Sequence, residues 1–312
     1  MSIATLTLNP AVDVTHEIKR LIPDRKVHAL ATRYDPGGNG INVSRALKRL
    51  EVTARTFCVL AGETGQFLER LLSKHLDDPA YIHIPGETRI NCTLLELEAR
   101  SQYEVSGVGP YLDPSHLQEL QSGFVQHVAD GYGVVTGSVP PGVPDTIYAD
   151  LVKAIRAHGG RPILDAHHEL LRKGVRAGPF LVKPNRYEIE QLIGRKLEGI
   201  TEVAQAVRQL LGQRRNIDYI CVSLGEEGAI LSSASKTWHA FPPKVEVRST
   251  VGAGDTMVAG LVAGFVQGLE EPEILRLAVA CSAGTVMQPG TELFDPADLP
   301  RLLWQVTIEL LD

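Results

Sequence analysis

Residues 249–255, Ser-Thr-Val-Gly-Ala-Gly-Asp, place one carboxylate after a run of small side chains, and an apolar stretch at 257–266 follows. Small side chains leave the first backbone N–H groups of a helix open to an anion, and the helix dipole adds roughly 0.3–1 kcal/mol of attraction. Because a carboxylate there opposes anion binding, Asp255 is better suited to take a proton from a hydroxyl beside the anion. The alternative is an ordinary acidic residue in a first helical turn.

A second glycine-rich turn lies at 36–42, Pro-Gly-Gly-Asn-Gly-Ile-Asn, ahead of a helical pattern. Gly38 and Gly40 match the first two glycines of a dinucleotide fingerprint, but Val43 stands where the third small residue is needed. The GxxxxGK[ST] phosphate loop is also absent from the sequence. Besides a simple turn, the segment allows close backbone approach to a small polar ligand, with Asn42 offering one donor and one acceptor.

Strand-like and helical patterns alternate along most of the chain, which predicts an α/β fold with a mostly parallel sheet covered on both faces. Strands are expected at 3–8, 53–60, 133–136, 162–165, 180–182 and 217–223, and helices at 41–50, 145–157, 169–175, 187–193 and 201–211. Ligands of such sheets bind beyond the carboxyl ends of the strands. Asn9, Ser138, Asp165 and Lys183 follow or end strands and are therefore expected at that edge.

Two stretches, at about 14–35 and 88–106, fit the alternation poorly and contain short extended segments around charged turns. We interpret them as a small β-sheet lid inserted into one domain that spans residues 1–312. A few isolated strands usually need a partner surface, so a homodimer through the lids is expected.

Composition excludes several classes of protein. The 312 residues carry a formal net charge of −6, which argues against a general nucleic-acid binder. No run approaches the roughly 18 apolar residues of a membrane span, and no secretory signal pattern opens the chain. The four cysteines are far apart and lack a CxxC pair, so we expect reduced, buried thiols and a cytoplasmic location.

Six motifs in a fixed order give the chain a resemblance over nearly its whole length. The sequence resembles the PfkB branch of the ribokinase-like carbohydrate kinases, and most of all the group of 6-phosphofructokinases, 1-phosphofructokinases and tagatose-6-phosphate kinases. The resemblance implies a three-layer α/β sandwich with a small β lid, an ATP-dependent reaction and Mg²⁺. The motifs are TLNPAVD at 7–13, GGNGINV at 37–43, TGSVPPG at 136–142, VKPN at 182–185, VSLG at 222–225 and TVGAGD at 250–255.

By this resemblance, Asp255 is the general base, and the amides of Gly252, Ala253 and Gly254 form the anion hole. Other positions of the family pattern bind the phosphorylated sugar, and Arg89 and Ser138 contact the phosphate that it already carries. The implied sugar-binding residues are Asp13, Lys26, Gly37, Gly38, Asn42, Arg89 and Ser138.

The resemblance also implies a nucleotide site and two cation sites. Asn185 and Glu188 fit an NxxE pattern that helps to place Mg²⁺ through water, although a bare NxxE is only a helix-start pattern. Backbone oxygens near Ser249, Val251 and Gly290 correspond to a K⁺ site of relatives. The implied nucleotide-binding residues are Lys183, Asn185, Ser223, Gly225 and Gly228.

Three positions depart from the family pattern. His28 replaces an arginine of some fructose-6-phosphate kinases, so one phosphate contact is expected to be weaker or pH-dependent. Asn39 replaces a lysine common in 1-phosphofructokinases and tagatose-6-phosphate kinases. His167 and His168 replace small hydroxyl residues, and a metal site there is an alternative that neighbouring histidines seldom form.

The main expectation is therefore ATP-dependent phosphorylation of fructose 6-phosphate to fructose 1,6-bisphosphate. Lys26 favours this acceptor, and the missing lysine at Asn39 opposes the alternatives, fructose 1-phosphate and tagatose 6-phosphate. A catalytically silent sugar-phosphate sensor on the same fold is a further alternative, which the intact Asp255 and glycines oppose.

Overall fold

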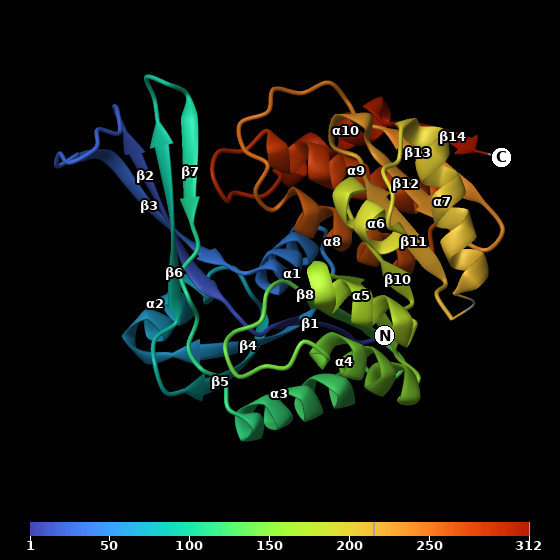
Figure 1. The fold of residues 1–312 in the computed structure, drawn as a ribbon, viewed down its shortest axis with the longest axis horizontal. Helices are drawn as coiled ribbons and strands as arrows, with labels where there is room; N and C mark the ends of the chain where they lie inside the picture. Colours follow the sequence, from blue (N-terminus) through green and yellow to red (C-terminus); the bar gives the residue numbers. More distant parts are fainter. Residues whose placement is uncertain (215, 312) are drawn as a thin grey trace.

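A computed structural model describes residues 1–214 and 216–311. Its main sheet has ten strands in the order β14-β13-β12-β11-β10-β9-β8-β1-β4-β5 (Figure 1). The strands from β11 to β5 in that order are parallel, and β12, β13 and β14 continue the sheet antiparallel. The bounds are β1 (Ile3–Thr7), β4 (Arg55–Ala61), β5 (Asp78–Ile84), β8 (Tyr132–Thr136), β9 (Arg161–Asp165), β10 (Leu181–Val182), β11 (Tyr219–Ser223), β12 (Ala229–Ser232), β13 (Thr237–Phe241) and β14 (Thr307–Leu311).

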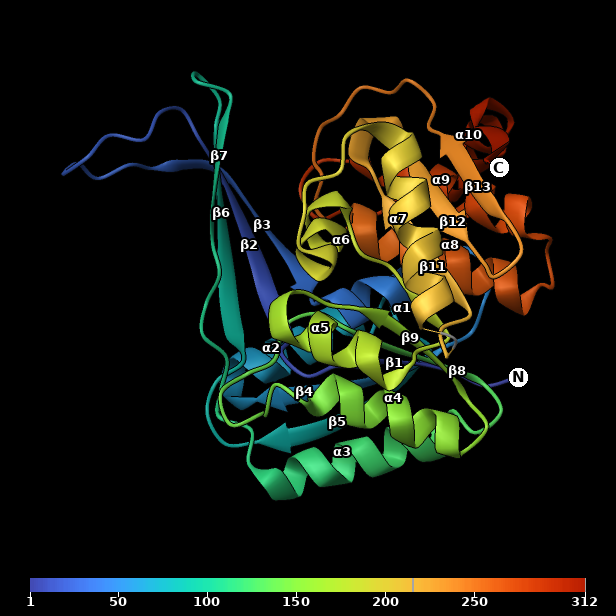
Figure 2. The same cartoon turned by 45° about the vertical axis from the view of Figure 1, so that its right-hand side comes forward.

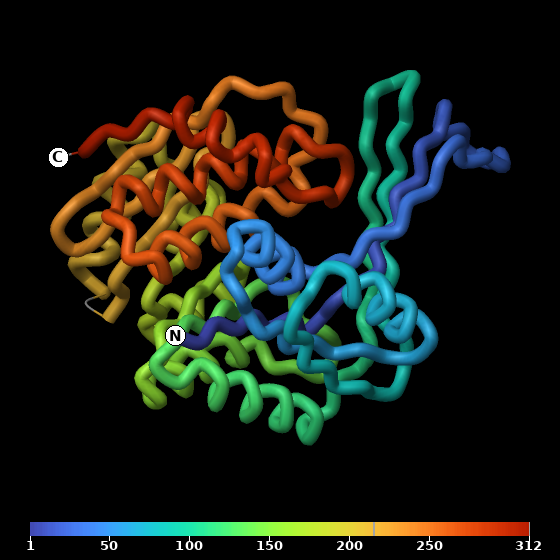
Figure 3. The backbone as a smooth tube through the Cα atoms, turned by 180° about the vertical axis from the view of Figure 1, so that it is seen from behind, coloured from blue at the N-terminus to red at the C-terminus, as the bar shows by residue number. Residues whose placement is uncertain are grey.

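Helices cover both faces of this sheet, which confirms the predicted three-layer α/β architecture (Figures 1 and 3). Because the central strands are buried on both sides, β1 and β8 are continuous apolar or small runs rather than alternating ones. One face carries α3 (Pro114–His127), α4 (Ile147–Ala157), α5 (His168–Ala177), α6 (Arg186–Ile193) and α7 (Gly199–Gln213). The other carries α1 (Asn39–Arg49), α8 (Ala253–Val266), α9 (Glu271–Val286) and α10 (Leu299–Gln305), while α2 (Gly62–Leu72) packs beside β4.

A separate four-stranded sheet, the small sheet, projects from the main body (Figure 2). Its strands are β3 (Ala29–Gly37), β2 (Ala11–Ile18), β6 (Arg89–Glu96) and β7 (Ser101–Val105), in that order. The sequence predicted strands in both segments, but β2 begins before the predicted start of the first segment and β3 extends past its end. These extensions matter because they connect the small sheet to the ends of the main sheet's strands. Within the described parts of the chain, no helix is long and apolar enough to cross a membrane.

Helices α8 and α9 lie against each other through glycines of α8. A Cβ added to Gly260 would lie 2.6 Å from the Cα of Ala278, and one added to Gly264 would lie 3.1 Å from the Cα of Ile274. Both obstacles are backbone atoms of α9, so the two helices can be this close only because these residues lack side chains. The apolar run at 257–266 continues the helix whose start the sequence predicted, and residues 257–264 of it are buried.

Substituting Gly260→Ala should destabilise the fold, because the added methyl group forces α8 and α9 apart. We expect a loss of about 1–3 kcal/mol in the free energy of unfolding, measured by urea denaturation. Gly212→Ala is the matched control, since Gly212 lies in α7 and, among the described residues outside its own helical turn, no atom lies within 4 Å of an added Cβ. That control should be neutral or stabilising by up to about 1 kcal/mol, and equal losses in both variants would contradict the packing account.

Candidate active site

Several of the predicted site residues lie at the carboxyl ends of the parallel strands. Asn9 lies beyond β1, Ser138 beyond β8, Asp165 ends β9 and Lys183 follows β10. Helices α1 and α8 begin at the same edge, so their first turns face these side chains. These residues lie at the strand ends where the sequence placed them, and their role as a binding site stays a prediction.

Asp255 lies in the first turn of α8 and is 4% exposed. Its two carboxylate oxygens accept hydrogen bonds from two amides of α1. Asn39 Nδ2 is 2.9 Å from Oδ1, and Asn42 Nδ2 is 2.9 Å from Oδ2. The contact with Asn42 connects two motifs that are far apart in the sequence, whereas sequence reasoning assigned Asn39 no role at the site.

Burial raises the pKa of Asp255 to about 7, and the nearby Asp165 carboxylate adds to the increase. The amides of Asn42 and Asn39 and the ammonium of Lys183 act in the opposite direction. A carboxyl group with a pKa near neutrality can both accept and release a proton at physiological pH, which suits a general base. This environment was not readable from the sequence, because it depends on which side chains surround the carboxylate.

Lys183 and Asp165 form a buried ion pair beside the turn that starts α8. Lys183 Nζ is 3.1 Å from Asp165 Oδ1, and an added Cβ on Gly254 would lie 3.5 Å from the same Nζ. Burial works to lower the pKa of Lys183, but the attraction of Asp165 outweighs it, so the pKa is raised and the side chain stays cationic. A fixed positive charge therefore lies next to the predicted anion hole.

The predicted anion hole has open backbone donors at its glycines. Gly252 caps α8 with φ of 77°, a conformation that favours glycine. Ala253 N donates to Thr250 O at 3.4 Å, whereas the N–H groups of Gly252 and Gly254 have no backbone acceptor among the described residues. The structure thus leaves two of the three predicted amides available to an anion.

Asp13 lies in β2 of the small sheet, close to the start of α1. Asn91 Nδ2 donates to Asp13 Oδ1 at 2.8 Å, and burial raises the pKa of Asp13 to about 6. A Cβ on Gly37 would lie only 2.3–2.5 Å from the Asp13 carboxylate. Gly37 is therefore glycine because the carboxylate occupies the space of a side chain, and Gly38, with φ of 128°, turns the chain into α1.

Arg89 and Ser138 are brought together by Asn9. The Nε and Nη2 atoms of Arg89 donate to the Asn9 carbonyl oxygen at 3.1 and 2.8 Å. Asn9 Nδ2 donates to Ser138 Oγ at 3.1 Å. This corner, which we call the Arg89 corner, is defined by Asn9, Arg89 and Ser138, and it offers a guanidinium and a hydroxyl to an anionic group.

A cavity of about 880 Å³ borders the first turn of α8. The predicted nucleotide residues Ser223, Gly225 and Gly228 line it, as do Ala253 and Gly254. The loop between β13 and α8 supplies a wall that sequence reasoning missed, since prolines and valines carry no chemical signal by themselves. The additional lining residues include Pro242, Pro243, Lys244, Val245, Val247 and Met257.

Asn185 and Glu188 form a reciprocal helix cap at the start of α6. Glu188 N donates to Asn185 Oδ1 at 2.9 Å, and Asn185 N donates to Glu188 Oε2 at 2.8 Å. Burial raises the pKa of Glu188. The helix-start alternative for this pattern is therefore realised, and the role in placing Mg²⁺ stays a prediction.

The predicted K⁺ residues lie together and are connected to the small sheet. Ser249 Oγ donates to the Gly290 carbonyl oxygen at 2.6 Å, and Val251 N donates to Ser249 Oγ at 3.2 Å. On the small sheet, Arg33 Nη2 donates to the Pro289 carbonyl oxygen at 3.0 Å. Asp35 Oδ2 accepts from Arg33 Nε at 2.7 Å and from Thr291 Oγ1 at 2.9 Å.

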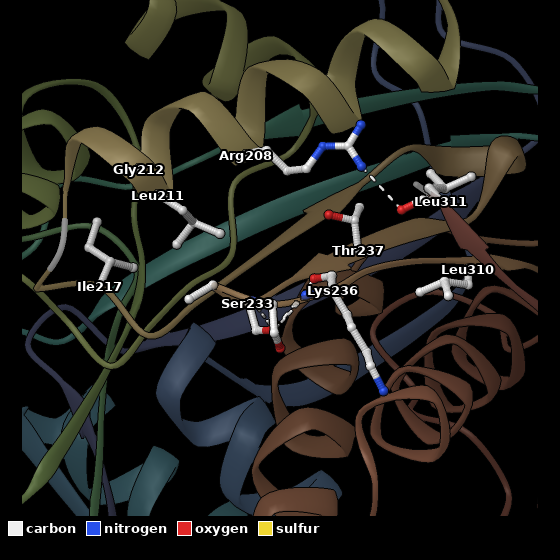
Figure 4. A pocket seen from close by; sticks show the side chains of 11 residues that line it. Arg208, Leu211, Gly212, Ile217, Ser233, Lys236, Thr237, Leu310 and Leu311 are labelled. Carbon is white, nitrogen blue, oxygen red and sulfur yellow. Dashed lines mark hydrogen bonds between the residues drawn. The ribbon is translucent and has the colours of Figure 1, made fainter.

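Several singled-out residues lie away from this cluster. Lys26 and His28 are exposed in the connection between β2 and β3, at the protruding end of the small sheet (Figure 2). His167 and His168 border a separate cavity of about 450 Å³, and the described residues contain no group of three or more His, Cys, Asp or Glu that could hold a metal. Another cavity, of about 650 Å³, lies between α7 and β14, where Arg208 Nη1 donates to the Leu311 carbonyl oxygen (Figure 4). None of the predicted site residues lines it.

Comparison with known proteins gives the same family as the motifs. The family model described as pfkB family carbohydrate kinase matches residues 4–298. The chain belongs to this family. It is therefore a phosphotransferase that acts on a sugar hydroxyl, as the sequence predicted.

Similar proteins align with this kinase over nearly its whole length. The 1-phosphofructokinase of Bacillus subtilis is 31% identical, with 96% of this chain and 98% of the relative covered. That of Escherichia coli K12 is 33% identical, with 98% of both covered. A structure of phosphofructokinase-2 from Escherichia coli in complex with substrates and products is 29% identical, has a TM-score of 0.93 and covers 97% of this chain and 99% of its own. Another structure of that protein is in complex with potassium.

Substituting Lys183→Met in this PfkB kinase should be strongly destabilising, because it leaves Asp165 buried without its counter-charge. We expect a loss of about 3–5 kcal/mol in the free energy of unfolding at pH 7. Lys173→Met is the matched control, since Lys173 of α5 pairs with Asp145, which lies before α4, and the two side chains are 28% and 56% exposed. That variant should lose no more than about 1 kcal/mol, and similar losses in the two variants would contradict the buried pair.

Proposed function

We propose that this kinase transfers the γ-phosphoryl group of ATP to a hydroxyl of a phosphorylated ketohexose, with Asp255 as general base. The observation that carries the proposal is the position of the Asp255 carboxylate. It is buried in the first turn of α8, where the neighbouring Ala253 and Gly254 line the 880 Å³ cavity, and it accepts hydrogen bonds from the amides of α1. A base at this place can act on a hydroxyl that meets the nucleotide's terminal phosphate.

The charges around the turn support phosphoryl transfer. The N–H groups of Gly252 and Gly254 and the ammonium of Lys183 stabilise negative charge that develops on the transferred group. Asp13 accepts hydrogen bonds from sugar hydroxyls, and the Arg89 corner binds the phosphate that the acceptor already carries.

Mg²⁺ is general for kinases of this family, and the residues present fit it. Glu188 and Asn185 provide carboxylate and amide oxygens, the ligand types that Mg²⁺ prefers, and they suit contact through water. When bound, the ion neutralises phosphate charge, while Lys183 and the glycine amides supply the fixed protein charges. Ser249, Val251 and Gly290 are proposed to hold K⁺ through backbone oxygens, in line with a potassium complex of a structural neighbour.

We propose fructose 1-phosphate as the acceptor, with fructose 6-phosphate as the second candidate. Full-length relatives at 31–33% identity are named 1-phosphofructokinase, while a structural neighbour at 28% identity is in complex with fructose-6-phosphate. Neither of the two residues on which the expectation of fructose 6-phosphate rested belongs to the Arg89 corner. Lys26 lies far out on the small sheet, and Asn39 contacts Asp255 rather than the Arg89 corner.

The homodimer, the lid role of the small sheet and the cytoplasmic location stay predictions. Exposed apolar side chains on the small sheet support a partner surface, since a few strands rarely leave such a face uncovered. A neighbour, phosphofructokinase-2 of Escherichia coli, has a structure described as its tetrameric inhibited form. The exposed side chains are Leu30, Tyr34, Ile90, Tyr103 and Val105.

The acceptor is tested by kcat/KM for fructose 1-phosphate, fructose 6-phosphate and tagatose 6-phosphate with MgATP. We expect fructose 1-phosphate to give the highest value, and a higher value for fructose 6-phosphate would establish the second candidate instead.

Asp255→Asn should lower kcat by about 10²–10⁴ with the preferred acceptor, the usual contribution of a positioned base. Its affinity for nucleotide should be nearly unchanged, and a variant with most of its kcat would remove Asp255 from the mechanism.

Substituting Arg89→Ala should weaken acceptor binding, because it removes the only guanidinium predicted to contact the acceptor's phosphate. We expect the KM for the sugar phosphate to rise by about tenfold to a hundredfold, in the range of a lost charge-assisted hydrogen bond. The KM for ATP should change little. Arg301→Ala is the control, since Arg301 is an exposed residue of α10. Equal loss for both substrates would argue against the Arg89 corner as the phosphate site.

A further inference from the structure

Asn39 donates a hydrogen bond to one carboxylate oxygen of the proposed base, Asp255. It is the first residue of α1, and its Nδ2 lies 2.9 Å from Asp255 Oδ1. Asn42, three residues later on the same helical face, lies 2.9 Å from Oδ2. Each oxygen of Asp255 therefore has its own amide donor, and both donors come from one rigid helical turn.

The surroundings fix both amides in this orientation. Asn42 Oδ1 accepts a hydrogen bond from Arg45 Nη1 at 3.2 Å, which leaves its NH₂ group facing Asp255. Asn39 Oδ1 lies against Gly137, where an added Cβ would be 2.9 Å away. Gly137 has φ of 89°, so the turn after β8 passes close to Asn39 only as glycine. An ionised carboxylate is an acceptor only, which matches two N–H donors.

Two charged groups act on Asp255, and a third contacts its donor Asn42. Asp165 lies on the side of the strand ends and favours the protonated form, while Lys183 from the end of β10 favours the ionised form. Arg45 of α1 lies behind Asn42. Because burial is the largest effect and disfavours the charge, the two amides are needed to keep the carboxylate ionised near neutral pH.

We propose that Asn39 is a positioning residue for the transfer reaction, whose amide orients Asp255 Oδ1 and stabilises the ionised carboxylate. This inference rests on the proposed role of Asp255. In the reaction, the acceptor's O–H bond breaks, and its proton passes to an Asp255 oxygen. The acceptor oxygen forms a bond to the γ-phosphorus as the bond to ADP breaks. Asn39 and Asn42 leave each carboxylate oxygen a further lone pair for that proton.

The test is the pH dependence of kcat/KM for the preferred sugar phosphate in the wild type, Asn39→Ala and Asn39→Lys. Activity requires ionised Asp255 and is lost as the pH falls through its pKa, which is raised to about 7. Removing the Asn39 donor raises that pKa further. We expect the acid limb of Asn39→Ala to move up by about one pH unit. At pH 6 this shift lowers kcat/KM about tenfold relative to the wild type, and kcat/KM of the variant recovers near pH 9.

Asn39→Lys should shift the acid limb in the opposite direction, to lower pH, because a cation beside Asp255 favours the ionised carboxylate. A residue with a merely structural role would not shift the limb in opposite directions in the two variants. Thermal unfolding of each variant with and without MgADP checks that the fold and the nucleotide site persist.

Unmoved acid limbs in both variants would overturn the inference, as would an Asn39→Ala variant whose only change is a higher acceptor KM, since that would make Asn39 a sugar contact. Asp255→Asn separates this result from failure of the proposed function. If that variant loses its kcat while the limbs of the Asn39 variants stay in place, only the role of Asn39 is wrong. If Asp255→Asn keeps its kcat, the base assignment itself fails.

Discussion

The site depends on one buried carboxylate whose charge is stabilised by neighbours from separate elements. Asp255 accepts hydrogen bonds from amides of α1, its negative charge is disfavoured by Asp165 at the end of β9, and it is favoured by Lys183 after β10. None of these groups alone sets its protonation, because burial pushes the pKa up while the donors and the ammonium pull it down. The position of α1 against α8 is therefore as important to the chemistry as the carboxylate itself.

The rest of the fold holds these elements in place. Gly260 and Gly264 let α9 pack closely against α8, and this packing holds α8 in position. The small sheet carries Asp13 and Arg89 toward the same strand ends. It is also connected to the loop next to Ser249 through Arg33 and Asp35, so the segment that starts α8 and the small sheet share hydrogen-bonded contacts.

Much of this could be predicted from sequence because the signals are local. The alternation of strands and helices predicted the parallel sheet, and the glycines before Asp255 predicted an anion-binding helix start. The role of Asn39 could not be predicted, since its contact with Asp255 joins residues 216 positions apart and depends on how two helices pack. The antiparallel strands β12 to β14 and the apolar cavity wall at 242–247 also lacked a distinctive pattern. Lys26 matched a family position, yet the protruding end of the small sheet places it away from the cluster in this chain.

In the proposed mechanism, Asp255 is a buried base that titrates near neutrality. A ¹³C NMR titration of the side-chain carboxyl groups tests this most directly, in protein labelled at aspartate and with the Asp255 signal assigned by its absence from Asp255→Asn. We expect a midpoint near pH 7 for that signal in the nucleotide-free enzyme, well above the usual aspartate value of about 3.9. A midpoint at or below pH 4 would show that the hydrogen bonds and Lys183 stabilise the carboxylate at least as much as burial and Asp165 oppose it, and would contradict a base that titrates near neutrality.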